Sequence, residues 1–209
     1  MTNSNIVKLS VGLVGAALVT VVGGQAAEAV TINFAGGDPA NGSVGFSDYT
    51  TSGLSTAGTQ SVVQSANGLG VLGGGLDSPQ IDGLGPDETL RLSFTNKVTL
   101  TSIGFARVFD AFLPFVGRVN DEFQLFVDGV SVFSGDIPGG NFLDTATGTL
   151  GPISFTGKQF DFTVTDNTDA YFLASVEVVP EPLTILGSLS AVGIGTALKK
   201  RQAKRNLKG

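Results

Sequence analysis

Carboxylate and amide oxygens gather in two short stretches of the sequence, and oxygens of this kind can bind a divalent cation. The stretches contain Asp82, Asp87 and Glu88, and then Asp166, Asn167 and Asp169. Ca²⁺ takes six to eight oxygen ligands from loops of this composition. We therefore name four candidate Ca²⁺ ligands: Asp82, Glu88, Asp166 and Asp169. The spacing does not fit an EF-hand, and a shared site requires the two stretches to meet in space.

A second interpretation of the same residues stays open. Asp and Asn side chains also form turns by accepting hydrogen bonds from their own backbone. On that interpretation the two stretches are loops without a ligand, and the protein has no cofactor. The metal interpretation implies a Ca²⁺-dependent, lectin-like module.

The composition removes several catalytic mechanisms. The chain contains no His and no Cys, which excludes Ser-His-Asp triads, cysteine nucleophiles and thiolate zinc sites. Two carboxylates could hydrolyse a glycoside, and Asp121 and Glu122 form the candidate pair. Adjacent residues of a strand point to opposite faces, so this pair cannot easily flank one bond. We expect no enzyme activity, with a carboxylate-dependent glycoside hydrolase as the alternative.

The charge of the chain is unevenly distributed. Residues 30–179 contain 16 acidic and five basic residues, a net charge of −11, whereas residues 199–209 hold six of the twelve basic residues and no acidic one. Nucleic acid requires a basic surface, so we expect no nucleic-acid partner. An acidic body fits a secreted protein whose copies repel one another.

Strand patterns dominate the region between the two ends. Hydrophobic residues alternate with polar ones at Leu90, Leu92 and Phe94, and again at Phe160, Phe162 and Val164. Asp128-Gly129 separates two such runs and predicts a tight type I′ hairpin. No stretch shows a sustained helical period. Residues 35–88 are rich in Gly, Ser and Asn, and we expect mostly loops there, with brief strands at 44–49 and 61–64.

One change of phase predicts a bend. Val98 and Leu100 follow one alternation, and Ile103 and Phe105 follow the other. A slip of one residue indicates a bulge or a strand that passes from one sheet to another. We predict an all-β fold, a β-sandwich of jelly-roll type with about eight to ten strands. Its core would contain the 15 Phe residues, and without Trp the aromatic surfaces for a sugar are limited to Tyr49 and Tyr171.

The amino terminus has the features of a secretory signal peptide, residues 1–29. Lys8 precedes an apolar run over 11–22, and Ala27 and Ala29 occupy the small-residue positions before a cleavage point. We expect signal peptidase to cut before Val30, after a helical signal segment. A retained anchor is the alternative, although the run is shorter than the roughly 20 residues that a span needs.

The carboxyl terminus, residues 180–209, has three parts in a fixed order. Pro180, Glu181 and Pro182 end the last strand, because proline cannot continue a hydrogen-bonded ladder. An apolar segment follows over 183–198, which we expect to be helical. A basic end begins with Lys199, Lys200 and Arg201. By the positive-inside rule these basic residues stay cytoplasmic and the body crosses the membrane.

This order of Pro-Glu-Pro, short apolar segment and basic end resembles the PEP-CTERM sorting signal of Gram-negative bacteria. The resemblance implies export, a transient inner-membrane anchor and processing by an exosortase. It also implies a place at the cell envelope or in the extracellular matrix, where the family is associated with polysaccharide and biofilm. A plain single-pass anchor is the alternative.

The body, residues 30–179, is also similar to modules common in PEP-CTERM proteins. The similar stretches are residues 81–90, 98–105, 123–129 and 171–176. Such modules resemble non-catalytic carbohydrate-binding and adhesion domains. The resemblance implies a structural or adhesive role, with extracellular polysaccharide as the partner.

Overall fold

The computed structural model describes six stretches of the chain: residues 28–73, 78–84, 87–108, 110–113, 117–140 and 145–181. All regular structure in these stretches is β, in 14 strands. The all-β prediction is therefore confirmed. The predicted signal helix and the apolar segment over 183–198 lie outside the described residues.

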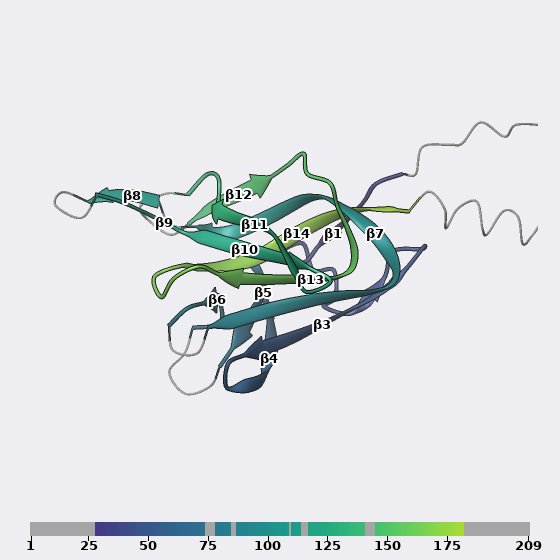
Figure 1. Cartoon of the computed structure of the whole chain (residues 1–209), viewed down its shortest axis with the longest axis horizontal. Coiled ribbons are helices and arrows are strands. Elements are labelled where there is room, and N and C mark those ends of the chain that lie inside the picture. The colour runs from purple at the N-terminus through teal and green to yellow at the C-terminus, as the bar shows by residue number, and fades with distance from the viewer. Residues whose placement is uncertain are drawn as a thin grey trace, which may run out of the picture.

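The strands have the following bounds in chain order: β1 (Val30–Asn33), β2 (Gly42–Ser43), β3 (Asp48–Ser55), β4 (Gly58–Ser65), β5 (Gly68–Leu72), β6 (Ile81–Asp82), β7 (Glu88–Val108), β8 (Asp110–Leu113), β9 (Gly117–Asn120), β10 (Glu122–Val127), β11 (Val130–Asp136), β12 (Ala146–Leu150), β13 (Phe155–Val164) and β14 (Ala170–Pro180). Every pairing is antiparallel, and β8 and β9 form a separate ribbon at one end of the molecule (Figure 1).

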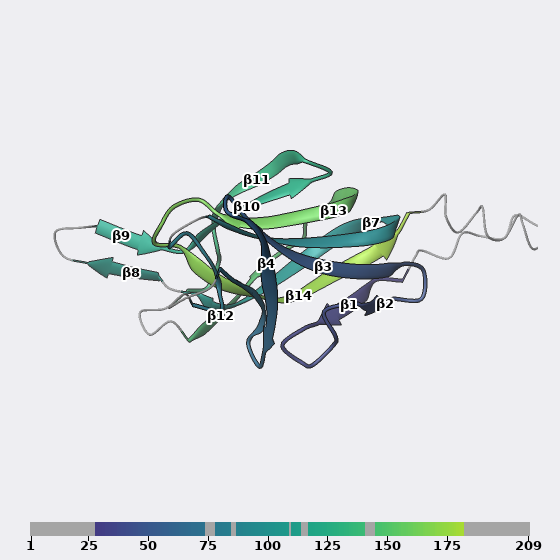
Figure 2. The ribbon, with the colours of Figure 1, turned by 90° about the horizontal axis from the view of Figure 1, so that it is seen from below.

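The long strand β7 organises the sheet. Its first half lies between β3 and β13, whereas its second half pairs with β14 and β12. The path β7-β14-β5-β4-β3 returns to β7, so the sheet closes into a barrel-like arrangement, and β13, β10 and β11 extend it on one side (Figure 2). Closure removes strand edges along this path. The jelly-roll connectivity stays a prediction.

The predicted change of phase in β7 is confirmed. Val178 pairs with Leu100 and Glu177 pairs with Ser102, so Thr101 is an extra residue in the ladder. This bulge lies where β7 leaves β13 and continues beside β14. Because the bulge turns the side-chain phase, both Leu100 and Ile103 point into the core and are fully buried.

The predicted hairpin at Asp128-Gly129 is also confirmed. Both residues have positive φ, 49° and 83°, which is the signature of a type I′ turn, and Val127 pairs with Val130 across it. Oδ1 of Asp128 accepts hydrogen bonds from the amides of Lys158 and Gln159, both at 3.0 Å. The turn residue therefore also fixes the neighbouring strand β13.

The Gly-rich region contains more strand than we predicted. The brief strand expected at 44–49 is replaced by β2 and by β3, which begins at Asp48, and the one expected at 61–64 is part of the longer β4. Two short turns, at 56–57 and 66–67, connect β3, β4 and β5 into a meander. Much of β4 is exposed, and its exposed positions hold polar residues such as Thr and Ser. The alternation of hydrophobic and polar residues that marks a half-buried strand is therefore weak here.

Among the described residues, one hydrophobic core fills the space that the sheet encloses. It includes Phe105, Phe123 and Tyr171, whose rings contact one another with centroids 4.7–6.2 Å apart. Alternate residues of β10 and β13 enter this core, as the two-residue period predicts. In the described part of the chain, no helix is long and apolar enough to cross a membrane.

Candidate functional site

The two acidic stretches meet at one end of the barrel. β6 pairs with the start of β14, with Ile81 opposite Tyr171 and Asp82 opposite Ala170. The amide of Gly83 donates to the carbonyl of Asp169 over 3.4 Å. The spatial condition for a shared site is therefore met, and the engagement of each carboxylate decides what the site can do.

The carboxylate of Asp82 is engaged within its own loop. Its Oδ2 accepts from the hydroxyl of Ser78 at 2.7 Å, and its Oδ1 accepts from the amide of Leu84 at 3.0 Å. Oε2 of Glu88 accepts from the amide of Asp82 at 3.4 Å. Both acidic side chains are buried, 4% and 1% exposed. They hold the loop before β7 in shape.

The carboxylate of Asp169 joins two strands. Its Oδ2 accepts from the amides of Thr165 and Asp166, at 3.1 and 2.9 Å, and from the hydroxyl of Thr165. Its Oδ1 accepts from the amide of Glu122 at 3.1 Å. Only 2% of Asp169 is exposed. This side chain therefore closes the β13–β14 turn and anchors it to the start of β10.

Asp166 is different because it lies on the surface of that turn. Its Oδ1 accepts from the amide and the hydroxyl of Thr168, at 2.7 and 2.6 Å. The Thr168 hydroxyl first, and then its backbone amide, lower the pKa of Asp166 below its ordinary value. These contacts are those of an Asx turn.

No group of three or more acidic side chains among the described residues is arranged to hold a metal ion. The contacts of Asp82, Asp166 and Asp169 fit the turn interpretation, since backbone and hydroxyl donors engage their oxygens. Binding of Ca²⁺ to the four candidate ligands stays an untested hypothesis.

The two carboxylates of the candidate hydrolase pair, Asp121 and Glu122, bind different parts of the fold. Asp121, 3% exposed, accepts from the amide of Ala170 at 3.1 Å through Oδ1. Glu122 is half-buried and accepts from the hydroxyl of Thr165 at 2.9 Å. Each carboxylate thus has a structural partner of its own.

The two tyrosines that we considered as sugar-stacking surfaces are buried. Tyr171 is fully buried and Tyr49 is 4% exposed. Their hydroxyls donate to the carbonyls of Thr163 and Pro39, at 3.0 and 2.9 Å. Burial raises the pKa of both phenols, and the charges of Asp169 and Asp121 add to the rise at Tyr171. Tyr171 therefore offers no face to a ligand, and Tyr49 offers only the small part of its ring that lines the pocket beside β1.

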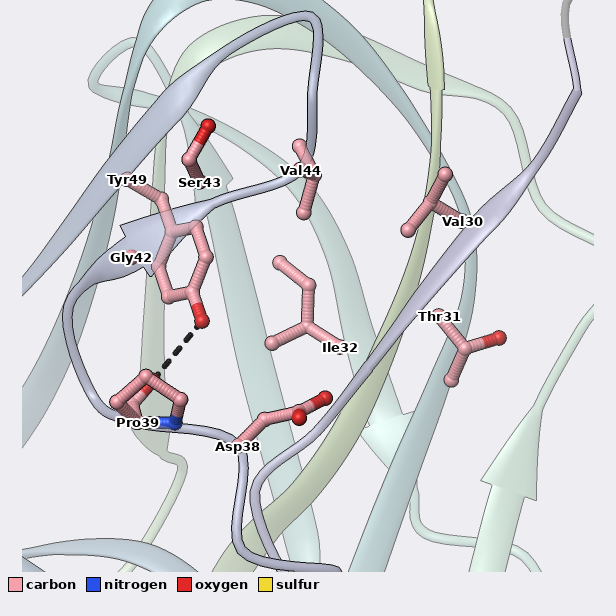
Figure 3. A pocket seen from close by; sticks show the side chains of 9 residues that line it. All are labelled: Val30, Thr31, Ile32, Asp38, Pro39, Gly42, Ser43, Val44 and Tyr49. Carbon is pink, nitrogen blue, oxygen red and sulfur yellow. Dashed lines mark hydrogen bonds between the residues drawn. The ribbon is translucent and has the colours of Figure 1, made fainter.

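A pocket of about 350 Å³ lies beside β1. In Figure 3, Ile32 lies between β1 and the ring of Tyr49, and the Tyr49 hydroxyl points to Pro39. Asp38 at the rim accepts from the amide of Asn33 at 2.8 Å. The pocket thus combines an apolar floor with polar groups that hold the loop after β1, and it adjoins the predicted mature amino terminus at Val30.

A second hollow, of about 370 Å³, lies on the outer face of the sheet. Leu54, Thr89, Thr163 and Gln124 form a row across β3, β7, β13 and β10, since each is paired with the next. Phe126 lines the same hollow from β10. The alternation of β10 places Phe126 outside, with Gln124, so the prediction that the core contains all Phe residues is wrong for Phe126.

The residues of the two predicted processing sites lie at the ends of the body. Ala29 immediately precedes β1, which begins at Val30. Pro180 is the buried last residue of β14 and pairs with Val98, so it belongs to the strand that we expected it to follow. Outside the described residues lie Ala27, Pro182 and the basic group Lys199, Lys200 and Arg201.

No protein-family model, no curated protein and no solved structure matches the chain.

Proposed function

We propose that the protein is exported and serves as a non-enzymatic structural or adhesive protein at the envelope, or in the extracellular matrix, of a Gram-negative bacterium. Signal peptidase would release it before Val30, and an exosortase would process the tail that begins at Pro180. Extracellular polysaccharide is the proposed partner.

One observation carries this proposal. The first strand begins at Val30, where signal peptidase would cut, and the last strand ends at Pro180, the first residue of the predicted tail, so the sheet overlaps the tail by this one residue. A segment can be removed without damage only if the fold does not need it. The agreement between the ends of the sheet and the ends of the predicted targeting segments supports removal at both.

The pairing of β1 with β14 also bears on how the body would be displayed. Val30 pairs with Val178, so both ends of the body emerge at the same end of the barrel (Figure 1). β14 has 11 residues, so its first residue lies roughly 33 Å from Pro180. A body held by its tail would present the β13–β14 turn away from the membrane.

Mass spectrometry of the mature protein from an exosortase-containing host tests the proposal. We expect a chain that begins at Val30 and lacks its basic end. Ala29→Phe should block the first step, whereas Glu28→Gln, between the two small positions, should not. Pro182→Ala should leave the tail unprocessed, whereas Thr184→Ser should not. A Pro182→Ala chain that is processed and located like the wild type would contradict sorting, because a plain anchor needs only the apolar run and the basic end.

A further inference from the structure

The ring of Phe126 has an unusual place. Every other phenylalanine whose side chain the structure describes is either buried or packed against the core. Phe126 is half-buried on the outer side of β10 and belongs to neither group. An aromatic ring on the outside of a sheet leaves apolar area in contact with water and gains no core contacts, so a ligand that covers it is one reason to keep it there.

Phe126 belongs to one of two parallel rows of side chains on this face. The first row is Leu54, Thr89, Thr163 and Gln124, and the second is Ser52, Arg91, Asp161 and Phe126. Each row crosses β3, β7, β13 and β10, which lie side by side (Figure 2). At about 4.8 Å between strands the rows are roughly 14 Å long, enough for several linked sugar rings.

The charges on this face select against an anionic ligand. Arg91 is bound to Asp161 through two hydrogen bonds of 2.8 and 2.9 Å, so its charge is already compensated. Among the described residues that line the hollow, the exposed Asp87 is the one ionisable residue. A polyanion would therefore be repelled by the Asp87 carboxylate with no free cation among these described residues to bind it, whereas an uncharged chain would not be repelled.

The position of the face selects against an extended peptide. A peptide that joins a sheet needs an unpaired strand edge. Here β3 is flanked by β4 and β7, and β10 is flanked by β13 and β11. At the hollow, Leu54 of β3 is paired on both sides, and so are the residues of β7, β13 and β10 in the same row. A ligand over the hollow must therefore be held by side chains: an apolar ring face, hydroxyls, an amide and a carboxylate.

We propose that the outer face of β3, β7, β13 and β10 binds an uncharged polysaccharide, with one sugar ring stacked on Phe126. Gln124, Thr89 and Asp87 would bond to its hydroxyls. The inference rests on the proposed function, because it assigns a surface and a ligand class to the polysaccharide contact. Sugar rings combine an apolar face with a rim of hydroxyls, and this face offers both kinds of partner.

Affinity electrophoresis of the full chain in a non-ionic detergent tests the proposal, with laminarin as the uncharged polysaccharide, chitosan as the cationic one and alginate as the anionic one. We expect laminarin to retard the chain more than chitosan or alginate does. Phe126→Ala should weaken binding about tenfold, and Phe126→Tyr, which keeps the ring, should stay within about twofold of the wild type. Val130→Ala is the matched control. Val130 is 65% exposed and pairs with Val127, so it lies on the face of the β10–β11 hairpin that does not carry Phe126.

Thermal unfolding of each variant separates a lost contact from a lost fold. Phe126→Ala should melt near the wild type, since Phe126 does not pack on the core. If it unfolds, Gln124→Ala tests the same face, with binding about threefold weaker. Absence of retardation by laminarin, stronger retardation by chitosan or alginate, or equal retardation of wild type and folded Phe126→Ala would overturn the inference. A chain that binds laminarin through Phe126 but is not processed in its host would keep this inference and refute the proposed function.

Discussion

The carboxylates of Asp121 and Asp169 form a reciprocal pair of hydrogen bonds with backbone amides. Oδ1 of Asp121 accepts from the amide of Ala170, and Oδ1 of Asp169 accepts from the amide of Glu122, both at 3.1 Å. Each carboxylate thus binds the residue that follows the other Asp. The exchange fastens the start of β14 to the start of β10, which do not pair as neighbouring strands.

This exchange predicts that Asp169 matters more for stability than its neighbour on the same turn. Asp169→Ala should lower the free energy of unfolding by about 2–4 kcal/mol, because it leaves buried amides without acceptors. Asp166→Ala is the matched control, since Asp166 is exposed, and it should cost less than about 1 kcal/mol. Urea unfolding measures both, and equal losses would contradict a buried fastening role.

The close approach of the two acidic loops gives a second prediction. A Cβ atom on Gly83 would overlap the carbonyl oxygen of Asp166 and lie 2.9 Å from the Cα of Asn167. Gly83→Ala should therefore force the loops apart and destabilise the fold by about 1–3 kcal/mol. Leu84→Ala, at a side chain that is 68% exposed, should have almost no effect in the same urea titration. If the two variants unfolded alike, the loops would not be in contact.

The elements that could be predicted from sequence are those in which one face is buried. The alternation at Leu90, Leu92 and Phe94 and the positive-φ pair Asp128-Gly129 carry their own geometry, so β7 and the β10–β11 hairpin were predicted correctly. The prediction shortened or missed β3 and β4 because their exposed positions hold Thr and Ser, residues that occur in loops as well as in strands. Closure of the sheet depends on Leu69 meeting Leu173, a contact between distant residues that no local pattern contains.

The candidate site shows the same division. The local residue types predict a turn that contains Asp166 and Asp169, and the structure has this turn between β13 and β14. That Asp169 is buried and reaches Glu122, 47 residues away in sequence, is a property of the assembled sheet. The outward position of Phe126 was visible in the alternation with buried Leu125 and Val127, but the number of phenylalanines favoured a uniform assignment to the core.

Buried Tyr171 predicts sensitivity to alkali. Burial, and then the charges of Asp169 and Asp121, raise the pKa of this phenol well above its ordinary value of 10.0. The folded state therefore favours the neutral phenol, and its contribution is complete below pH 10 and is lost as the pH rises through the folded pKa. We expect the melting temperature to fall above about pH 10.

The variant Tyr171→Phe isolates this effect. It should cost about 1 kcal/mol at neutral pH, because the bond from the Tyr171 hydroxyl to the Thr163 carbonyl is lost. It should also lose less stability than the wild type between neutral and alkaline pH. Part of the alkaline loss should remain, since burial also raises the pKa of Tyr49. Identical pH profiles for wild type and variant would show that Tyr171 does not govern alkaline unfolding.

The calcium interpretation gives the last prediction. Oδ1 of Asp166 already accepts two hydrogen bonds from Thr168, and the oxygens of Asp169 accept from amides and from the Thr165 hydroxyl. An ion would have to displace these donors, so we expect millimolar Ca²⁺ to raise the melting temperature no more than equal Mg²⁺ does. Ca²⁺ that binds only the folded state at 100 times its Kd would add about 2.7 kcal/mol, a shift that thermal unfolding of the full chain resolves. A rise specific to Ca²⁺ that disappears in Asp166→Asn/Asp169→Asn would instead assign the loops to a Ca²⁺ site, because generic screening would act on wild type and variant alike.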